Sequence, residues 1–245
     1  MLDAVIALAS ALAGAIAAVV GFGIGSVLTP LVALRFGTKL AVAIVSVPHF
    51  IGTALRFATL WRRVDKSVLI RFGILSAAGG LAGALLNAKA NSPALTIVFG
   101  LLLLFAGATT LFDKKLHFGR ITAQIAGAVS GFLGGLVGNQ GGIRSAALLG
   151  FDIEKESFVA TATAIGLVVD GARMPVYIAT QGHEMLAART EMLIAIAGVV
   201  LGTLIGVRLL RRIPERLFRR GVGALVMLLG AYMLYRGIVT TTRVR

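Results

Sequence analysis

The sequence has no cysteine, three histidines, five prolines and only ten acidic residues. Without cysteine the chain has no disulfide, no thiolate metal ligand and no cysteine nucleophile. The three histidines, His49, His117 and His183, are scattered and form no helical pair of the kind that binds zinc. Because this leaves no residue set for a resident ion or prosthetic group, we expect no metal and no other cofactor.

Charged residues are also scarce, and apolar residues take their place. Charged residues make up 14% of the chain and hydrophobic residues 58%, with a mean hydropathy of +0.94. Soluble domains carry about 25% charged and about 45–50% apolar residues. The apolar runs are long enough for membrane helices, which need about 20 residues. They cover residues 4–34, 40–60, 68–88, 93–112, 121–150, 157–180, 190–207 and 221–239. The sequence therefore predicts an all-α, multi-pass integral membrane protein.

The basic residues lie in short loops between these runs. The net charge is +14, and the loops at Arg62–Lys66 and at 208–220 are rich in lysine and arginine. Short basic loops of this kind remain on the cytoplasmic side of a membrane. We therefore expect the lipid bilayer of the inner (plasma) membrane as the partner of this chain, and not nucleic acid.

The chain repeats itself at an interval of 117 residues. This interval relates Gly14 to Gly131, Gly21 to Gly138, Gly25 to Gly142, and Arg56 to Arg173. Duplicated halves with glycine breaks and internal charge are typical of secondary transporters. We predict a first transmembrane repeat at 1–112, a cytoplasmic linker at 113–120 and a second repeat at 121–245.

Two runs, 4–34 and 121–150, exceed the length of one crossing and are interrupted by glycines at 21–25 and 138–142. Each interior glycine costs a helix about 1 kcal/mol relative to alanine, so each run is predicted to form two short helices with an unwound tip between them. Equivalent loops of the two halves differ sharply in positive charge, which favours two inverted repeats. Inversion requires one re-entrant hairpin and three crossings per half. The alternative is eight simple crossings in which the first and fifth helices are kinked.

A helix that begins at either tip presents free N–H groups and the positive end of its dipole, which together bind anions. An alternative is that the glycines only permit tight packing. Substrate-binding candidates at the two tips are Gly23, Gly25, Ser26, Asn139, Gln140, Gly141, Gly142 and Arg144.

Four further candidates lie inside apolar segments, where ionisable groups are costly and usually functional. Arg56 and Arg173 would add positive field for the substrate, although Arg56 could instead extend to the membrane interface. Asp170 could position Arg173 as a local ion pair, or carry a coupling proton. His49 follows a proline, and would contact substrate, relay protons or bond to a carbonyl that the proline leaves free.

Residues 21–30 (GFGIGSVLTP) resemble the Gly-x-Gly-Gly-Gly…Pro signature of the sulfite exporter TauE/SafE family, with Ile24 where a glycine is usual. Residues 134–145 (GGLVGNQGGIRS) resemble its second-half signature. The resemblance implies an inner-membrane permease, usually an exporter, for sulfite, a sulfonate or a related anion.

These patterns together predict a transporter of a small anion, not an enzyme. The two tips would meet near the midplane and bind the anion, and the halves would move to give alternating access. The alternative is an anion channel that uses the same sites. A homodimer is left open by the sequence.

Overall fold

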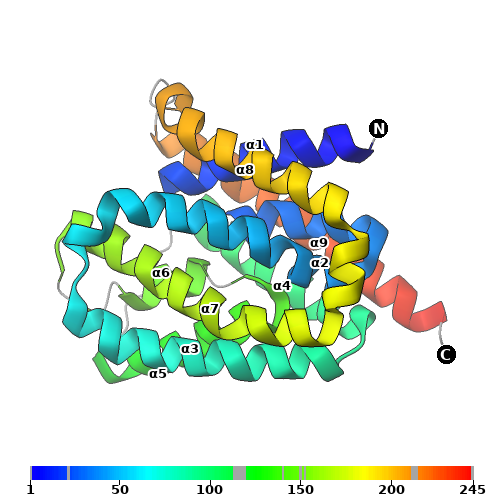
Figure 1. Cartoon of the computed structure of the whole chain (residues 1–245), viewed down its shortest axis with the longest axis horizontal. Coiled ribbons are helices and arrows are strands. Elements are labelled where there is room, and N and C mark those ends of the chain that lie inside the picture. Colours follow the sequence, from blue (N-terminus) through cyan, green and yellow to red (C-terminus); the bar gives the residue numbers. More distant parts are fainter. Residues whose placement is uncertain are drawn as a thin grey trace.

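The computed structural model describes residues 2–20, 23–112, 120–139, 141–148, 151, 153–210 and 215–243. Over these residues the regular structure is entirely helical, as predicted (Figure 1). The helices are α1 (Leu2–Val20), α2 (Ile24–Leu60), the short 3-10 helix η1 (Trp61–Arg63), α3 (Lys66–Lys89), α4 (Ser92–Leu111), α5 (Arg120–Val137), α6 (Gly141–Leu148), α7 (Lys155–Ala187), α8 (Arg189–Leu210) and α9 (Glu215–Arg243).

Several of these helices are long and apolar enough to cross a membrane. Among the described residues, five spans meet this criterion, and the helices before the two tips are shorter apolar segments. Large apolar side chains such as Ile74, Leu201 and Leu228 point away from the bundle, at 54–70% exposure. Such outward apolar faces suit lipid rather than water. The chain is therefore a multi-pass membrane protein. The five spans are Ile24–Arg63, Lys66–Lys89, Ser92–Leu111, Glu156–Ala187 and Arg216–Thr242.

Both long runs break where glycines cluster. Helix α1 ends at Val20 and α2 begins at Ile24, while α5 ends at Val137 and α6 begins at Gly141. Gly23 and Gly138 have φ values of 134° and 76°, a region that favours glycine. The predicted interruption of each run is confirmed. Gly21, Phe22 and Gln140 lie outside the described residues, as do positions 113–119 of the predicted linker.

A third break falls between the predicted apolar runs 4–34 and 40–60. At Gly37, with φ of 74° and ψ of 160°, the 37-residue helix α2 is kinked. A straight helix of that length would span about 55 Å, well beyond the roughly 30 Å of bilayer hydrocarbon. The repeat places Gly37 opposite Glu154, which lies between α6 and α7. Each half therefore has a short helix, a tip, a second short segment and then a long central helix.

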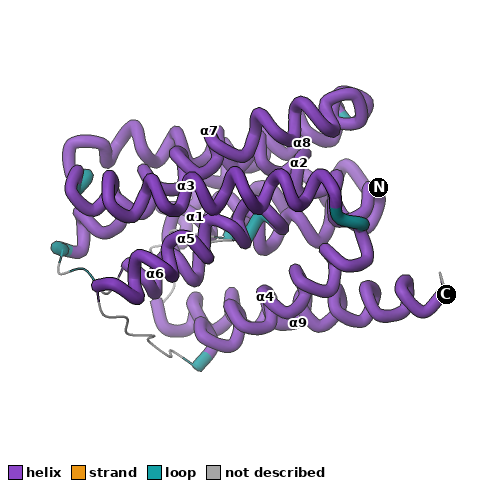
Figure 2. Tube along the Cα trace, turned by 90° about the horizontal axis from the view of Figure 1, so that it is seen from below, coloured by secondary structure: helices purple, strands orange, loops and turns teal. Residues whose placement is uncertain are grey.

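Close helix pairs join the two halves. Helix α1 packs along α8, α3 along α5, and α4 along α9, and Figures 1 and 2 show these pairs around the central α2 and α7. A Cβ atom on Gly83 would lie 2.0 Å from the Phe132 carbonyl oxygen, and one on Gly202 would lie 1.9 Å from that of Ala11. These glycines let backbones approach closely. The repeat makes α1 the equivalent of α5 and α8 the equivalent of α3. The α1–α8 and α3–α5 pairs are therefore the same contact seen from each half.

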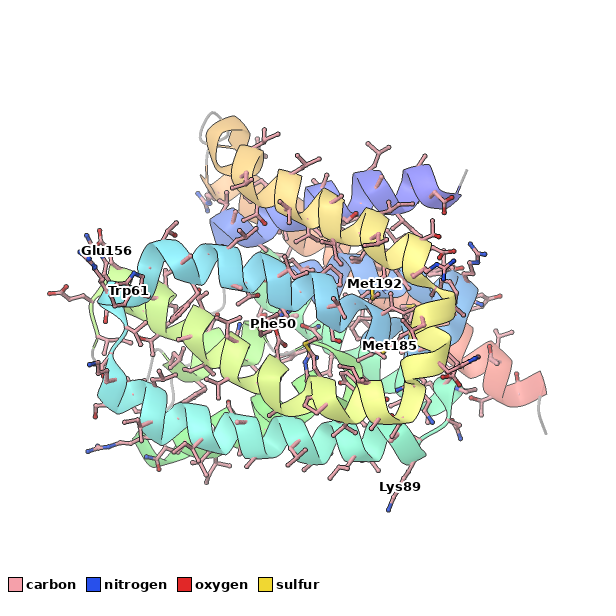
Figure 3. The ribbon with its side chains drawn as sticks, in the orientation of Figure 1. Phe50, Trp61, Lys89, Glu156, Met185 and Met192 are labelled. Atoms are coloured by element: carbon pink, nitrogen blue, oxygen red, sulfur yellow. The ribbon has the colours of Figure 1, made fainter. Side chains whose placement is uncertain are left out.

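The central helices run in opposite directions. Arg63, just after α2, pairs with Glu156 at the start of α7. Arg35, beside the α2 kink, pairs with Glu191 just after α7, at 2.6 Å. Figure 3 accordingly shows Trp61 and Glu156 at one end of the bundle and Met185 and Met192 toward the other. The part of α2 after Gly37 and its equivalent, α7, are therefore antiparallel.

The glycine contacts predict a selective loss of stability. We expect Gly83→Ala to destabilise the protein by about 1–3 kcal/mol, because the added methyl must separate α3 from α5. Gly171→Ala is the matched control, since a Cβ atom there would meet nothing within 4 Å. Thermal unfolding in detergent should show a lower midpoint for Gly83→Ala only. Equal midpoints would mean that the α3–α5 contact does not limit stability.

Candidate functional site

The two tips contact each other in the interior of the bundle. A Cβ atom on Gly25 would lie 2.3 Å from the Gly138 carbonyl oxygen. The Ser26 hydroxyl donates to Asn139 Oδ1 at 3.2 Å across 113 residues of sequence. Both side chains are buried. The structure thus brings together the two glycine breaks that the sequence singled out, and with them the first turns of α2 and α6.

The remaining tip candidates lie around this contact. Gly23 precedes α2, and its carbonyl accepts from the Val27 amide at 3.0 Å. Gly141 and Gly142 form the start of α6, with Arg144 in its first turn. The Thr29 hydroxyl is buried close to Gly138 and has no hydrogen-bond partner among the described residues. Gln140, also a candidate, is outside the described residues.

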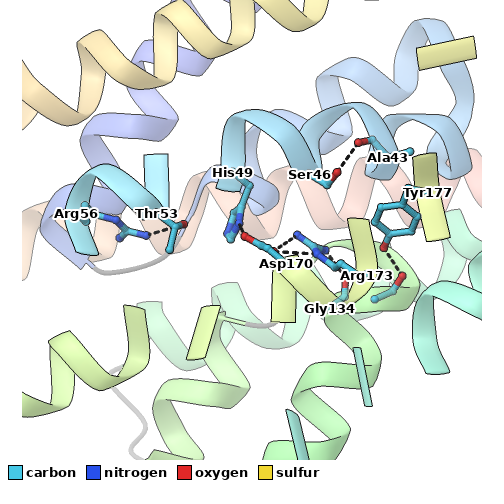
Figure 4. A network of polar contacts seen from close by, with 10 residues as sticks. Ala43, Ser46, His49, Thr53, Arg56, Gly134, Asp170, Arg173 and Tyr177 are labelled. Atoms are coloured by element: carbon cyan, nitrogen blue, oxygen red, sulfur yellow. Dashed lines mark hydrogen bonds and ion pairs between the residues drawn. The ribbon is translucent and has the colours of Figure 1, made fainter. Parts of the chain in front are cut away.

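A network of buried polar side chains links the two central helices (Figure 4). His49 on α2 lies with its Nδ1 atom 2.6 Å from Asp170 Oδ2 on α7. The other carboxylate oxygen of Asp170 accepts from Arg173 Nε at 2.9 Å, and Arg173 Nη2 lies 2.7 Å from it. Asp170 and Arg173 are at most 1% exposed. Of the alternatives weighed for this region, the structure shows the local Asp170–Arg173 ion pair, and it adds the contact to His49.

The duplicated arginines make the same contact in each half. Arg56 Nη1 donates to the Ala17 carbonyl oxygen, and Arg173 Nη1 donates to that of Gly134, each at 2.5 Å. The repeat relates Ala17 to Gly134 as it relates Arg56 to Arg173. Both acceptors lie in the last turn of the helix before a tip, where the negative end of the helix dipole stabilises cations. The Gly134 carbonyl oxygen also accepts from the Gly138 amide at 2.9 Å. Each arginine therefore ties its central helix to its own broken helix.

The two halves differ at the next positions. The repeat places Thr53 opposite Asp170, and Gly166 opposite His49. A Cβ atom on Gly166 would lie 3.5 Å from Thr53 Cγ2, so these two positions also face each other. One crossing of the central helices thus carries an imidazole and a carboxylate. The other carries a hydroxyl and a glycine, which leaves space.

Arg144 occupies that space. Its Nη1 atom lies 3.2 Å from the Cβ position of Gly166, and the residue is 3% exposed. Arg144 Nε and Nη1 have no hydrogen-bond partner among the described residues. The Thr53 hydroxyl accepts from Arg56 Nη2 at 3.3 Å, and Arg56 Nε is likewise unpartnered. We call this group of residues, Arg144, Thr53, Gly166 and Arg56, the Arg144 site.

Unpartnered guanidinium atoms are unusual in a buried site, because buried polar groups nearly always have a hydrogen-bond partner. Among the residues that the structure describes, the surrounding cluster holds three arginines, Arg56, Arg144 and Arg173, against the single carboxylate of Asp170. With His49 neutral, its net charge is +2. A cluster of this charge with unused N–H donors is suited to a small anion.

Sequence reasoning missed several residues of this cluster. Thr53 and Gly166 are ordinary residues of apolar segments, and only the repeat could have singled them out as equivalents of Asp170 and His49. Tyr177 donates its hydroxyl proton to the Gly135 carbonyl oxygen, one residue from the acceptor of Arg173. It strengthens the attachment of α7 to α5 and carries no sequence motif.

Comparison with known proteins agrees with these features. The profile of the sulfite exporter TauE/SafE family matches residues 6–233, which is nearly the whole chain and includes both tips, both central helices and the Arg144 site. No curated protein matches the chain. No solved structure matches it either. The multi-pass helical fold and the family profile lead to one identification: the chain belongs to the sulfite exporter TauE/SafE family of membrane transporters.

Proposed function

We propose that the protein carries a small sulfur-containing anion, such as sulfite or a sulfonate, across the inner membrane, and that Arg144 binds it. The observation that carries this proposal is the buried Arg144 guanidinium, whose Nε and Nη1 atoms lack partners beside the junction of the tips. An oxyanion supplies two acceptor atoms to one guanidinium group, a geometry that arginine favours. The family assignment supports the substrate class.

The tips supply the other contacts. Free N–H groups at the starts of α2 and α6 would favour negative charge beside the tip junction. Ser26 and Asn139 line that junction, and Gln140 is proposed to join them. Arg56 adds its unpartnered Nε donor beside Thr53. Arg173, whose contacts are with protein, contributes positive field. In this arrangement Gly141 and Gly142 let the anion come close to the backbone. Gly25 instead admits the Gly138 carbonyl oxygen, and Gly23 lies against Ile16.

The two halves, 1–112 and 121–245, are proposed to be inverted repeats joined by a cytoplasmic linker. Three observations support inversion. The equivalent helices α2 and α7 are antiparallel. The pairs α1–α8 and α3–α5 exchange under the repeat. The basic residues Arg62 and Arg63 lie at the end of the bundle opposite the α2 kink. Movement of one half against the other would expose the Arg144 site to each side in turn.

Flux in liposomes tests this function. Purified protein should transport sulfite with a rate that saturates as the concentration rises, and unlabelled sulfite outside should accelerate the exit of labelled sulfite. This exchange is expected of a carrier that must reorient with its substrate. Large single-channel currents carried by sulfite in a planar bilayer would instead show a channel, and the absence of any sulfite or sulfonate flux would reject the proposed function.

A further inference from the structure

We infer that His49 is a proton-binding site, and that its contact with Asp170 couples one proton to each transport cycle. The inference rests on the proposed anion transport. His49 lies twelve residues after Gly37 and eleven before Leu60, and Asp170 lies fifteen residues after Lys155 and seventeen before Ala187. The pair is therefore near the middle of both central helices, away from the basic ends of the bundle.

The geometry identifies the nitrogen that takes the proton. The ionised carboxylate of Asp170 only accepts hydrogen bonds, and Oδ2 lies 2.6 Å from His49 Nδ1. His49 must therefore carry a hydrogen on Nδ1, because two acceptors would repel each other. Protonation then occurs at Nε2 and converts the neutral ring into an imidazolium. This step turns the His49–Asp170 contact from a hydrogen bond between a neutral ring and a carboxylate into an ion pair.

The charged groups around the pair make its protonation depend on the anion. Those facing it are Arg173 on α7, Arg56 on α2 and Arg144 on α6. Arg173 and Arg56 oppose a proton on His49 when the Arg144 site is empty, and Arg144 adds a positive charge next to Asp170. A bound anion offsets that repulsion in a low-dielectric interior. Anion binding therefore favours protonation of His49, and by linkage a proton on His49 tightens anion binding.

The His49–Asp170 pair also connects the two halves of the molecule that are proposed to move against each other. His49 belongs to the first half and Asp170 to the second, 121 residues away. Because protonation strengthens this contact, it changes the free energy of any movement that separates α2 from α7. The equivalent crossing holds Thr53 and Gly166, which have no titratable side chain. This asymmetry predicts one proton per cycle rather than two.

Accumulation driven by a pH gradient tests the coupling. The probe is ethanesulfonate, whose own charge does not change between about pH 6 and about pH 8, the range in which histidine titrates. With one proton moving together with one monovalent anion, each pH unit of gradient should concentrate the anion about tenfold in proteoliposomes. His49→Gln keeps a donor for Asp170 but binds no proton. We expect it to show anion exchange without a gradient that needs a higher anion concentration, because no proton tightens binding, and to lose accumulation.

His183→Gln is the matched control, since His183 is exposed near the end of α7, and it should accumulate ethanesulfonate like the wild type. Full pH-driven accumulation by His49→Gln would overturn the inference. Loss of anion exchange in the wild type would instead reject the proposed function, so the two failures differ.

A second measurement needs no variant. Adding ethanesulfonate to weakly buffered wild-type protein in detergent should remove about one proton from solution for each anion bound, as reported by a pH-sensitive dye. Binding without proton uptake would overturn the coupling, even if His49→Gln failed to fold.

Discussion

Arg144→Ala will abolish sulfite flux and leave the protein inserted and at least as stable as the wild type in the absence of anion. The two parts of this expectation have one cause. Arg144 Nε and Nη1 make no hydrogen bond among the described residues, so replacing Arg144 by alanine removes no hydrogen bond of these two atoms. It removes a buried positive charge that the cluster does not neutralise, a change that relieves a cost of folding. The same change removes the donors that bind the anion.

Such a combination is expected where a binding site is maintained at the expense of stability. A residue with a structural role would behave differently, because its loss would lower stability and flux together. Flux in proteoliposomes and thermal unfolding in detergent therefore have to be measured on the same preparations.

Two further variants sharpen this test. Arg144→Lys keeps a positive charge but loses the planar pair of donors, so we expect sulfite to bind at least about tenfold more weakly. Arg71→Ala removes an exposed arginine of α3 and should leave flux unchanged. Normal flux in Arg144→Ala, or a loss of folding that matches its loss of flux, would show that Arg144 is not the binding group.

Ligand stabilisation gives an independent measure of the same site. Sulfite at about 100 times its dissociation constant should stabilise the wild type by about 2.7 kcal/mol, and it should leave Arg144→Ala unaffected. A rise in the unfolding midpoint of both proteins would place the anion elsewhere in the chain.

The sequence was most informative where glycine and charge interrupt apolar runs. Three glycines within five residues cannot continue a membrane helix without cost, so the breaks after Val20 and Val137 followed from local chemistry. The equivalence of Arg56 and Arg173 followed from the repeat alone. Their shared contact with a carbonyl before each tip did not, because an arginine at membrane depth can equally bind substrate, pair with an acid or extend to the interface.

The features that the sequence could not predict depend on how the helices cross. The contact of His49 with Asp170 requires the antiparallel packing of α2 on α7, which no local pattern specifies. The gap between the apolar runs 4–34 and 40–60 predicted a boundary here, but not that α2 continues through it with a kink at Gly37, whose positive φ favours glycine. Arg144 was predicted as a candidate from its place after a tip. Its lack of partners, which makes it the strongest candidate, is a property of the folded chain.

Asp170→Ala is expected to destabilise the protein by about 3–5 kcal/mol, the cost of leaving a buried charge without its partner. Arg173 would keep its bond to the Gly134 carbonyl but would lose the carboxylate that accepts from Nε and lies beside Nη2. The Asp170→Ala/Arg173→Met double variant removes both charges, so its cost should be smaller than the sum of the two single costs. Thermal unfolding of the four proteins gives this coupling energy.

The other half of the molecule provides the control for this cycle. Thr53 is the equivalent of Asp170, but its contact with Arg56 is one long hydrogen bond of 3.3 Å to an uncharged hydroxyl. Thr53→Ala should therefore cost only about 1 kcal/mol. Two results would contradict the ion pair as the main attachment of α7 at this crossing. One is that the losses of stability caused by the Asp170 and Arg173 substitutions are additive. The other is that Thr53→Ala and Asp170→Ala lower stability equally. A large coupling at Asp170 alone would show that the two halves, built from one repeat, have divided their tasks: one crossing holds a charge pair, and the other leaves a guanidinium free for the anion.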